Sequence, residues 1–525
     1  MKKIVSLLIC AILIVSCLAA CSENGEPSSV PSDESAAEVS TEAEDSLPEV
    51  SETEIEKILK NPDIYKGDDY YDKTFTIWTC YYTDNHPSEF VYNDGANEEQ
   101  MPETVNNAIA ERNKKVEDAI GVEIKEIYYK GYDRYGGDGI SLVRNFVNSG
   151  DPEIDCIDIC LYDCGTLAME GIVYDLYSLE NINMENPWWE QYFNETVTIA
   201  GQLYFTVGDI TLNSKDSTPV VFYNIDLIER LGLEDPFKIA KEGKWTIDEA
   251  IRYSKELCID TAEPEGVMDY KDTFGWAGQF DDLLSMLYGA GVRILSPGSD
   301  GYPVLTLDGE TTYELVDKVI EFIYEDCYIC GNDYFSVSPS PMDLLRKAFE
   351  EGRSIFYSGG MDNAQLFDME DRFGILPVPK LTAEQDQYYS LINTWQSNAI
   401  CIATNLDEEE AEFAAAVLDV MGFYSWSKYP DSVAYNYYNK MLKNQKLVTE
   451  DSEYILDLVF DARGCELGSI FQIGKLGSGG YTTVNDMLSS LMQQKGIGMF
   501  ASRYEKYGGY FEADLETLID RFKNN

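Results

Sequence analysis

Short apolar runs and amphipathic segments alternate along the chain from residue 74 onward. Thr74–Thr79 and Ile154–Leu161 have the length and apolar content of buried strands, and residues 121–129 alternate apolar and polar positions as a strand does. Between them, Glu103–Ala119 and Ser141–Val147 place apolar residues at helical spacing. This strand–helix–strand–helix–strand order predicts a mostly parallel sheet with helices on both faces.

A second block of alternating strands and helices follows the first. Gly232 ends one apolar helical run, as glycine often does. Thr246 precedes Glu249 by three residues, a capping-box spacing that predicts a helix over 247–257. The other expected elements are helices over 225–231, 281–288, 313–324 and 341–351, strands over 203–207, 220–223, 354–357, 373–377 and 399–403, and a mostly helical stretch from residue 408. We therefore expect two sheet blocks, with a chain that leaves each block and returns to it.

The first residues have the pattern of a secretory signal. Lys2 and Lys3 precede an apolar run to Leu18 that is shorter than the roughly 20 residues of a membrane span. The sequence Leu-Ala-Ala-Cys ending at Cys21 resembles a bacterial lipobox, in which the cysteine thiol carries the lipid, including palmitate. The alternative is a signal peptide that happens to contain a cysteine. We expect a signal peptide over 1–20 and anchoring of the protein through Cys21 to the outer side of the cell membrane.

Residues 22–56 carry twelve acidic and no basic residues. Such a stretch cannot bury enough apolar surface to offset chain entropy. We expect residues 21–60 to hold the lipidated cysteine and an acidic disordered linker. The whole chain has 94 acidic and 39 basic residues, a net charge of −55, which disfavours any general electrostatic binding to nucleic acid.

The motifs of common enzyme and metal-site classes are missing from the sequence. His86 is the single histidine, and the chain has no GxSxG, HExxH or P-loop motif. Nine cysteines remain after Cys21, among them the pair Cys327 and Cys330 in a CxxC arrangement. A zinc or redox site is one interpretation, and buried apolar thiols are the one we favour, because a single CxxC without a second pair is a weak signal. A disulfide between Cys327 and Cys330 stays open. We expect no metal and no cofactor.

Several stretches in a fixed order resemble one known family, the extracellular solute-binding proteins (family 1) of sugar-type ABC transporters. The resemblance covers most of residues 72–425 and also includes the order of the chain from lipobox to helical end. The stretches are Gly201–Tyr204 leading to Phe222–Asn224, Gly232–Pro236 with Gly243–Thr246, Phe349–Phe356, and Phe373–Lys380. Residues 425–500 depart from the family pattern.

The resemblance implies an α/β fold of the two-lobed, hinged periplasmic-binding-protein type (type II), with a helical C-terminal part. It further implies a ligand held between the lobes and delivered to the permease subunits of an ABC importer, with no catalysis, by a protein that we expect to be a monomer. We assign residues 61–212 and 358–397 to the first lobe, and residues 213–357 and 398–525 to the second.

Candidate ligand contacts follow from what a sugar needs, which is aromatic planes for its faces and polar side chains for its hydroxyls. Loops after the expected strands supply both kinds of residue, and Trp395, among polar neighbours, is the best stacking candidate. For the loop residues the alternative is a solvated loop, and for Trp276 it is a place in the core. The candidates are Tyr81, Tyr82, Asp84, Asp163, Asp209, Asn213, Trp276, Gln279, Gly360, Asp362, Trp395 and Gln396.

Two other functions are compatible with the sequence. One is binding of a cationic ligand, a polyamine or a peptide, for which an acidic, aromatic cleft would be suitable. The other is a surface glycan-active enzyme, which would need two carboxylates flanking the scissile bond. With 94 acidic residues, chance pairs are unavoidable, so sequence spacing cannot identify such a pair.

Overall fold

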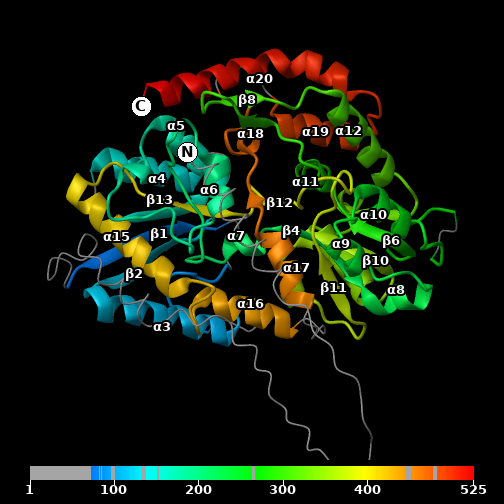
Figure 1. Ribbon diagram of the computed structural model, residues 1–525, viewed down its shortest axis with the longest axis horizontal. Coiled ribbons are helices and arrows are strands. Elements are labelled where there is room, and N and C mark those ends of the chain that lie inside the picture. Colours follow the sequence, from blue (N-terminus) through cyan, green and yellow to red (C-terminus); the bar gives the residue numbers. More distant parts are fainter. Residues whose placement is uncertain are drawn as a thin grey trace, which may run out of the picture. The chain divides into compact units, whose positions relative to one another are not determined.

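Two main sheets organise the chain, and the first contains the strands expected earliest in the sequence (Figure 1). Its order is β13–β3–β1–β2, with β1 parallel to β2 and β3 and with β13 antiparallel to β3. The parallel strand order predicted for the first block is thereby confirmed. The strands are β1 (Thr74–Cys80), β2 (Glu123–Tyr129), β3 (Cys156–Cys160) and β13 (Asn398–Cys401).

This computed structural model describes residues 72–81, 83, 86–95, 101–131, 137–150, 153–262, 266–444, 451–476 and 482–524. The expected signal peptide, the lipidation site Cys21 and the acidic linker lie outside the described residues, as do Tyr82 and Asp84. Among the described helices, none has both the length and the apolar content required to cross a membrane.

Helices cover both faces of the first sheet, as Figure 1 shows, with α4 and α5 on one side and α3 and α15 on the other. α3 stops at Gly121, which adopts φ 72° and donates its N–H to the Glu117 carbonyl. α15 begins with a capping box between Asp407 and Glu410. The helices are α3 (Glu103–Ile120), α4 (Asp138–Ser149), α5 (Leu161–Glu170) and α15 (Glu408–Ser425). We call this sheet and its helices the first lobe.

The second sheet has the order β11–β4–β10–β6–β5, and β9 also pairs with β6. Unlike the first sheet it is mixed, because β4 runs antiparallel to both β10 and β11 while β10 and β6 are parallel. The strands are β4 (Pro219–Asn224), β5 (Cys258–Ile259), β6 (Thr273–Gly278), β9 (Tyr328–Cys330), β10 (Ser354–Gly360) and β11 (Phe373–Leu376).

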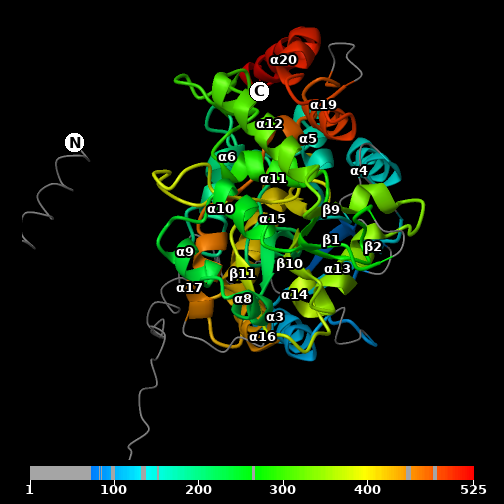
Figure 2. The ribbon, with the colours of Figure 1, turned by 90° about the vertical axis from the view of Figure 1, so that its right-hand side faces the viewer.

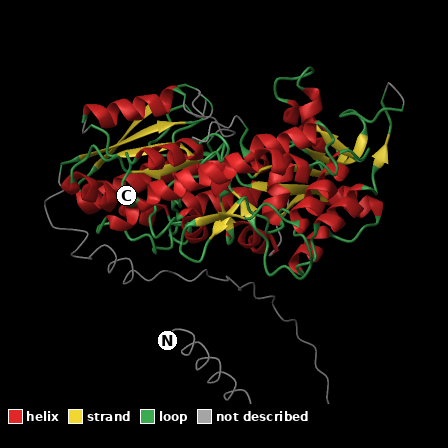
Figure 3. Ribbon diagram, turned by 90° about the horizontal axis from the view of Figure 1, so that it is seen from above, coloured by secondary structure: helices red, strands yellow, loops and turns green. Residues whose placement is uncertain are grey.

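Helices flank the second sheet as well, with α9 and α10 on one side and α13 on the other (Figure 2). Thr246 caps α10 by accepting the Glu249 N–H, as predicted from their spacing. This sheet and its helices form the second lobe, and strands lie among helices in both lobes (Figure 3). The helices are α8 (Ile225–Leu231), α9 (Pro236–Lys241), α10 (Ile247–Ser254), α11 (Asp282–Gly289), α12 (Glu310–Ile323) and α13 (Pro341–Glu350).

The expected lobe boundaries need correction at the return crossing. We expected residues 358–397 in the first lobe, but β10 and β11 pair with β4 of the second sheet. We expected residues 398–525 in the second lobe, but β13 pairs with β3, and α15 packs on α3. The short helix α7 (Asn213–Asp216) carries the chain from the first lobe into β4. An apolar run shows that a strand is buried, but not which strand it will pair with, and this is why the boundaries were misplaced.

The C-terminal part is helical, as expected, and contacts both lobes. α20 packs against α5 of the first lobe and against α12 and the β7–β8 hairpin of the second. β14 pairs with β12, a short strand that precedes the return crossing. The elements are β7 (Leu295–Pro297), β8 (Pro303–Leu305), β12 (Ser390–Leu391), β14 (Arg463–Gly464), α16 (Val433–Asn444), α17 (Asp451–Phe460), α18 (Leu467–Ile470), α19 (Val484–Gln493) and α20 (Phe500–Lys523).

The nine cysteines beyond the signal region are all free thiols in the structure, and every one except Cys258 is buried. Cys327 and Cys330 are not bonded to each other. Burial raises the pKa of each of these two thiols to about 12, so neither has the thiolate character of a reactive cysteine. The described residues contain no cluster of three or more histidine, cysteine or carboxylate groups arranged to hold a metal ion.

Candidate functional site

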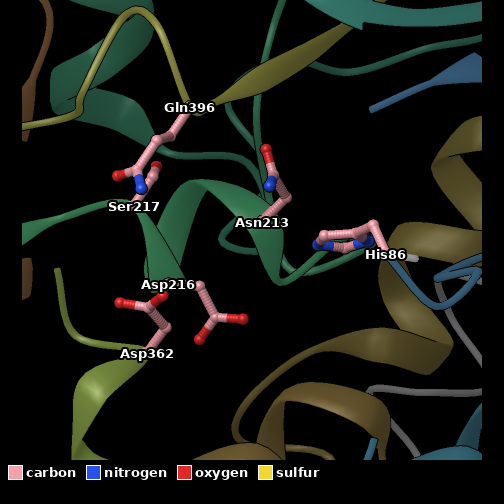
Figure 4. Close-up of a pocket in the computed structure, with 6 residues that line it drawn as sticks. All are labelled: His86, Asn213, Asp216, Ser217, Asp362 and Gln396. Carbon is pink, nitrogen blue, oxygen red and sulfur yellow. The ribbon is translucent and has the colours of Figure 1, made fainter. Parts of the chain in front are cut away.

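A polar pocket lies where the first crossing between the lobes meets loops from each lobe (Figure 4). The first lobe contributes His86, from the loop after β1, and Gln396, from the loop before β13. The second lobe contributes Asp362, which follows β10. The crossing itself supplies the remaining lining side chains, from α7 and the residue after it, which are Asn213, Asp216 and Ser217.

A second hollow adjoins the first and shares two of its side chains, His86 and Asp216. Residues at the start of α3 supply apolar atoms to its wall, and α16 contributes Tyr437. Its other lining residues are Pro87, Glu89, Met101, Pro102, Val105, Leu212 and Gln365. The two hollows together combine hydrogen-bonding groups with apolar surface.

The crossing helix α7 is held in place by side chains of the first lobe. Glu89 accepts the N–H groups of Leu212 and Asn213 through one carboxylate oxygen, at 2.7 and 3.1 Å. The Asn213 side-chain oxygen accepts the N–H of Asn398 at 2.7 Å. Asn398 in turn donates to Asp158 at 2.8 Å, which ties the crossing to the middle of β3. These bonds orient Asn213 at the pocket wall.

Behind α7 lies a buried ionic network. Lys215 has no exposed side-chain surface and pairs with Asp209 at 2.9 Å and with Glu190 at 3.4 Å. Arg463 of β14, also fully buried, pairs with the same Glu190. Burial alone would raise the pKa of Glu190, but the two cations hold it below its ordinary value. The network ties three separate segments to the crossing.

Two carboxylates, Asp216 and Asp362, lie next to each other at one end of the pocket (Figure 4). The Asp362 N–H donates to the Asp216 carbonyl at 3.2 Å. Asp216 accepts the Tyr437 hydroxyl at 2.6 Å, and Asp362 accepts the Asn363 amide at 3.0 Å. Burial, and then its acidic neighbour Asp362, raise the pKa of Asp216 well above its ordinary value. Burial raises the pKa of Asp362 to about 6.

His86 lines both hollows, and Glu89 lines the second. The His86 ring stacks on Tyr81, with ring centroids 4.0 Å apart and planes at 15°. Its Nδ1 lies 2.8 Å from the Pro87 carbonyl, which can only accept, so Nδ1 carries the proton of this bond. Glu89 is 2 % exposed, and burial raises its pKa to about 8. Glu89 is therefore a largely protonated carboxyl at neutral pH.

The pocket brings together three of the candidate residues named from the sequence, Asn213, Asp362 and Gln396. Two others lie directly behind its wall. Asp209 is 6 % exposed and holds Lys215. Gly360 precedes Asp362, and a Cβ there would lie 2.6 Å from the Asp362 carboxylate and 2.9 Å from the Asp216 carbonyl. Glycine at 360 thus leaves room for the Asp362 carboxylate and the Asp216 carbonyl, where any larger residue would clash with them.

Other candidates lie elsewhere, and the aromatic ones in particular do not line the pocket. Trp276 is fully buried in the second lobe, where its indole N–H donates to Asp282 at 3.1 Å and its ring packs on Phe322 and Phe356. Its place is therefore in the core, the alternative considered from the sequence. Tyr81 is also buried, under His86, and Trp395 is half-buried next to Gln396 without lining either hollow.

The remaining two described candidates do not line the hollows either. Asp163 is fully buried at the start of α5, and Gln279 is half-buried after β6, where its carbonyl accepts the Tyr328 hydroxyl. Sequence reasoning missed His86, Asp216 and Ser217. The run Asn213–Ser217 between two apolar strands was a usable signal, because polar residues at a lobe crossing are well placed to face a ligand.

Comparison with known proteins supports the fold. No protein-family model and no curated protein matches the chain. Among solved structures, UspC of M. tuberculosis aligns with 84% of this chain and 100% of its own, at 14% identity and a TM-score of 0.50. The ABC substrate-binding protein Lmo0181 from Listeria monocytogenes, solved in complex with cycloalternan, aligns with 86% of this chain and 99% of its own, at 14% identity and a TM-score of 0.49. The likeness to UspC confirms the expected α/β fold.

Proposed function

We propose that the protein is an extracytoplasmic solute-binding receptor that captures a carbohydrate, an oligosaccharide in our expectation, between its lobes and delivers it to an ABC importer. The observation that carries this proposal is the pocket at the crossing, because side chains of both lobes and of the segment between them line one hollow. A ligand that contacts all three would favour the closed arrangement of a hinged protein.

The chemistry of the two hollows suits a polyol. The Asn213 and Gln396 amides, the Ser217 hydroxyl and the two aspartates offer donors and acceptors to hydroxyl groups. The second hollow adds a small apolar area, to which Met101 and Leu212 contribute, for one face of a sugar ring. The stacking platform expected from Trp276 is not available, since that ring lies in the core. The proposal thus depends on hydrogen bonding more than on aromatic stacking.

The delivery role rests on the sequence resemblance and on the N-terminal pattern. We propose that Cys21 is lipidated, that the acidic linker holds the folded lobes away from the membrane, and that permease subunits receive the ligand. Labelling of cells with a palmitate analogue tests the anchor. Incorporation into the wild-type protein and its loss in Cys21→Ala would support it, and equal labelling of both would refute it.

A glycan-active enzyme is the second candidate, because two carboxylates with raised pKa share the pocket. Glycoside hydrolysis needs two carboxyl groups that flank the scissile bond, roughly 5–9.5 Å apart. Asp216 and Asp362 instead lie side by side, joined by a main-chain hydrogen bond, at one end of the pocket. This arrangement favours binding over hydrolysis. Chromatography of oligosaccharides incubated with the protein tests the distinction, and cleaved products would overturn the binding proposal.

The binding proposal is tested by calorimetric titration of neutral oligosaccharides of several linkages into the wild-type protein. Asn213→Ala and Gln396→Ala should each weaken binding about tenfold or more, since each removes side-chain hydrogen bonds to the ligand. Asn405→Ala, on a turn outside the pocket, is the control and should bind as the wild type does. Absence of binding to every neutral and charged sugar offered would refute the carbohydrate assignment.

A further inference from the structure

The described side chains that line the pocket include several acids and no lysine or arginine, and this charge imbalance bears on the charge of the ligand. Of the described residues that line the two hollows, three are carboxylic acids, Glu89, Asp216 and Asp362, and none is lysine or arginine. The nearby cations form ion pairs with other carboxylates. Lys215 pairs with Asp209 and Glu190, and Arg346 lies within ion-pair distance of Asp343 and Glu350.

Asp216 and Asp362 have no cationic partner within ion-pair distance among the described residues. Each keeps part of its surface open, because both are only half-buried as residues. Two neighbouring carboxylates in a partly desolvated pocket repel each other. Burial is the main cause that raises the pKa of both groups, and for Asp216 the nearby Asp362 carboxylate raises it further. A cation between them would remove the repulsion and gain two charge-assisted hydrogen bonds.

The rest of the lining limits the kind of cation. A bare metal ion would have few ligands here, because the described residues contain no cluster of three metal-binding groups. Asn213, Ser217 and Gln396 line the same pocket and supply neutral hydrogen-bonding groups beside the acidic end. The site therefore offers an ammonium position at one end and positions for hydroxyl or amide groups at the other.

From this arrangement we infer that Asp216 and Asp362 form a subsite for a positively charged amino group, and that the physiological ligand is an amine-bearing carbohydrate. This inference rests on the proposed function, and it narrows the ligand class from any oligosaccharide to a cationic one. Asp216 and Asp362 hold the ammonium, while the amides of Asn213 and Gln396 bind the neighbouring hydroxyls.

The charged groups around the pair set an expected pH dependence. Glu89 and Tyr437 face Asp216, and His86 lines the same hollow. Lys215 and Arg346 act on the pair from beyond ion-pair distance. Because the pKa of Asp362 is about 6, acidification from pH 7.5 to 5 protonates it and removes negative charge from the subsite. Binding of a cationic sugar should weaken over this interval, and binding of a neutral sugar should change far less.

The test is calorimetric titration of the full-length protein with matched oligomers that differ in charge. A glucosamine tetramer carries amino groups, its N-acetylated counterpart is neutral, and spermidine is a cation without a sugar ring. We expect the glucosamine tetramer to bind at least tenfold more tightly than the acetylated one. Asp216→Asn and Asp362→Asn should each lower its affinity tenfold or more and change that of the acetylated tetramer less than threefold. Asp118→Asn, on the exposed face of α3, is the control.

Each result bears on a separate claim. Equal or tighter binding of the neutral tetramer, or unchanged binding of the cationic one in both aspartate variants, overturns the ammonium subsite and leaves the carbohydrate receptor standing. Binding of spermidine through the two aspartates, with no sugar bound, supports the subsite and refutes the carbohydrate assignment. If neither tetramer nor spermidine binds, the subsite is refuted. Near-ultraviolet circular dichroism of each variant excludes misfolding as the cause of lost affinity.

Discussion

Two carboxyl groups near the crossing, Glu89 and Glu190, have opposite pKa shifts because their immediate neighbours differ. Glu190 faces two buried cations, Lys215 and Arg463, and its pKa is lowered. Glu89 is more deeply buried and has two backbone N–H groups instead, which offset only part of its desolvation, and its pKa rises to about 8. One buried carboxyl is therefore charged at neutral pH, and the other is mostly protonated.

Glu89→Gln should flatten the dependence of stability on pH. The folded state holds the Glu89 proton up to about pH 8, whereas the unfolded chain releases it near pH 4.5, so folding binds a proton between these values. The contribution of Glu89 to wild-type stability is thus fully present below about pH 4.5 and is lost as the pH rises toward 8. Relative to wild type, the variant should gain at least about 1 kcal/mol between pH 5 and pH 8, since one pKa unit corresponds to about 1.4 kcal/mol.

Urea denaturation at both pH values measures this gain. Glu190→Gln is the contrasting variant, because the lowered pKa of Glu190 means that its charged form stabilises the fold above its unfolded pKa. Glu190→Gln should therefore lose stability at pH 7, and most of that loss should vanish toward pH 3. A Glu89→Gln protein with the pH dependence of the wild type would contradict the assignment of the shift to Glu89.

Trp276→Ala should lower the stability of the second lobe and leave the ligand affinity of the folded protein unchanged. The ring is fully buried between Phe322 and Phe356, and its N–H bond to Asp282 would be lost. Replacement of a buried aromatic by alanine costs about 3–5 kcal/mol. Chemical denaturation measures the loss. The fraction that remains folded should bind ligand with wild-type affinity, and selective loss of affinity would instead place Trp276 at the ligand.

At the level of elements, the sequence predicted the helices and strands that depend on short-range patterns of apolar residues and on helix caps. The Thr246 cap, the helix after it and strands such as β1 and β4 were expected and are present. The strand β6 was not predicted, and residues 203–207, expected as a strand, do not form one. The helix α7 was not predicted, because four residues cannot form a stable helix from their own propensity. Glu89 and Asn398, far away in sequence, hold α7 in place. The pocket is built on this tertiary element, so only part of its lining could be identified from sequence.

Lys215→Met tests whether the buried ionic network fixes the crossing. The variant keeps the length of the side chain but leaves Asp209 and Glu190 with one cation fewer in a buried setting. Removal of one partner of a buried ion pair costs about 3–5 kcal/mol. Urea denaturation should show a loss of this order. Lys244→Met, which breaks the fully exposed pair with Glu242, is the matched control and should leave stability close to that of wild type. Equal stability of both variants would show that the network is not needed to hold α7.

Across the whole molecule, the last helix in the sequence connects elements that the sheet topology keeps separate. α20 packs on α5 in the first lobe and on α12 and β8 in the second. No motif in the sequence predicted this role for α20. The contact is made by buried side chains such as Phe522, which is 4 % exposed. Its ring meets Tyr204 with centroids 5.4 Å apart and Phe471 with centroids 6.0 Å apart.

Phe522→Ala should therefore loosen the attachment of α20 to the first lobe. Loss of a buried phenylalanine costs about 3–5 kcal/mol in a packed site. Hydrogen exchange should rise along α20 and around Tyr204, because opening of the helix now requires less free energy. Tyr510→Ala is the matched control, an aromatic of the same helix that is 44 % exposed and should change exchange little. Should the Phe522 variant retain wild-type protection along α20, the helix is fixed by its contacts to the second lobe alone, and ligand-driven movement of the lobes would carry it with α12 and not with α5.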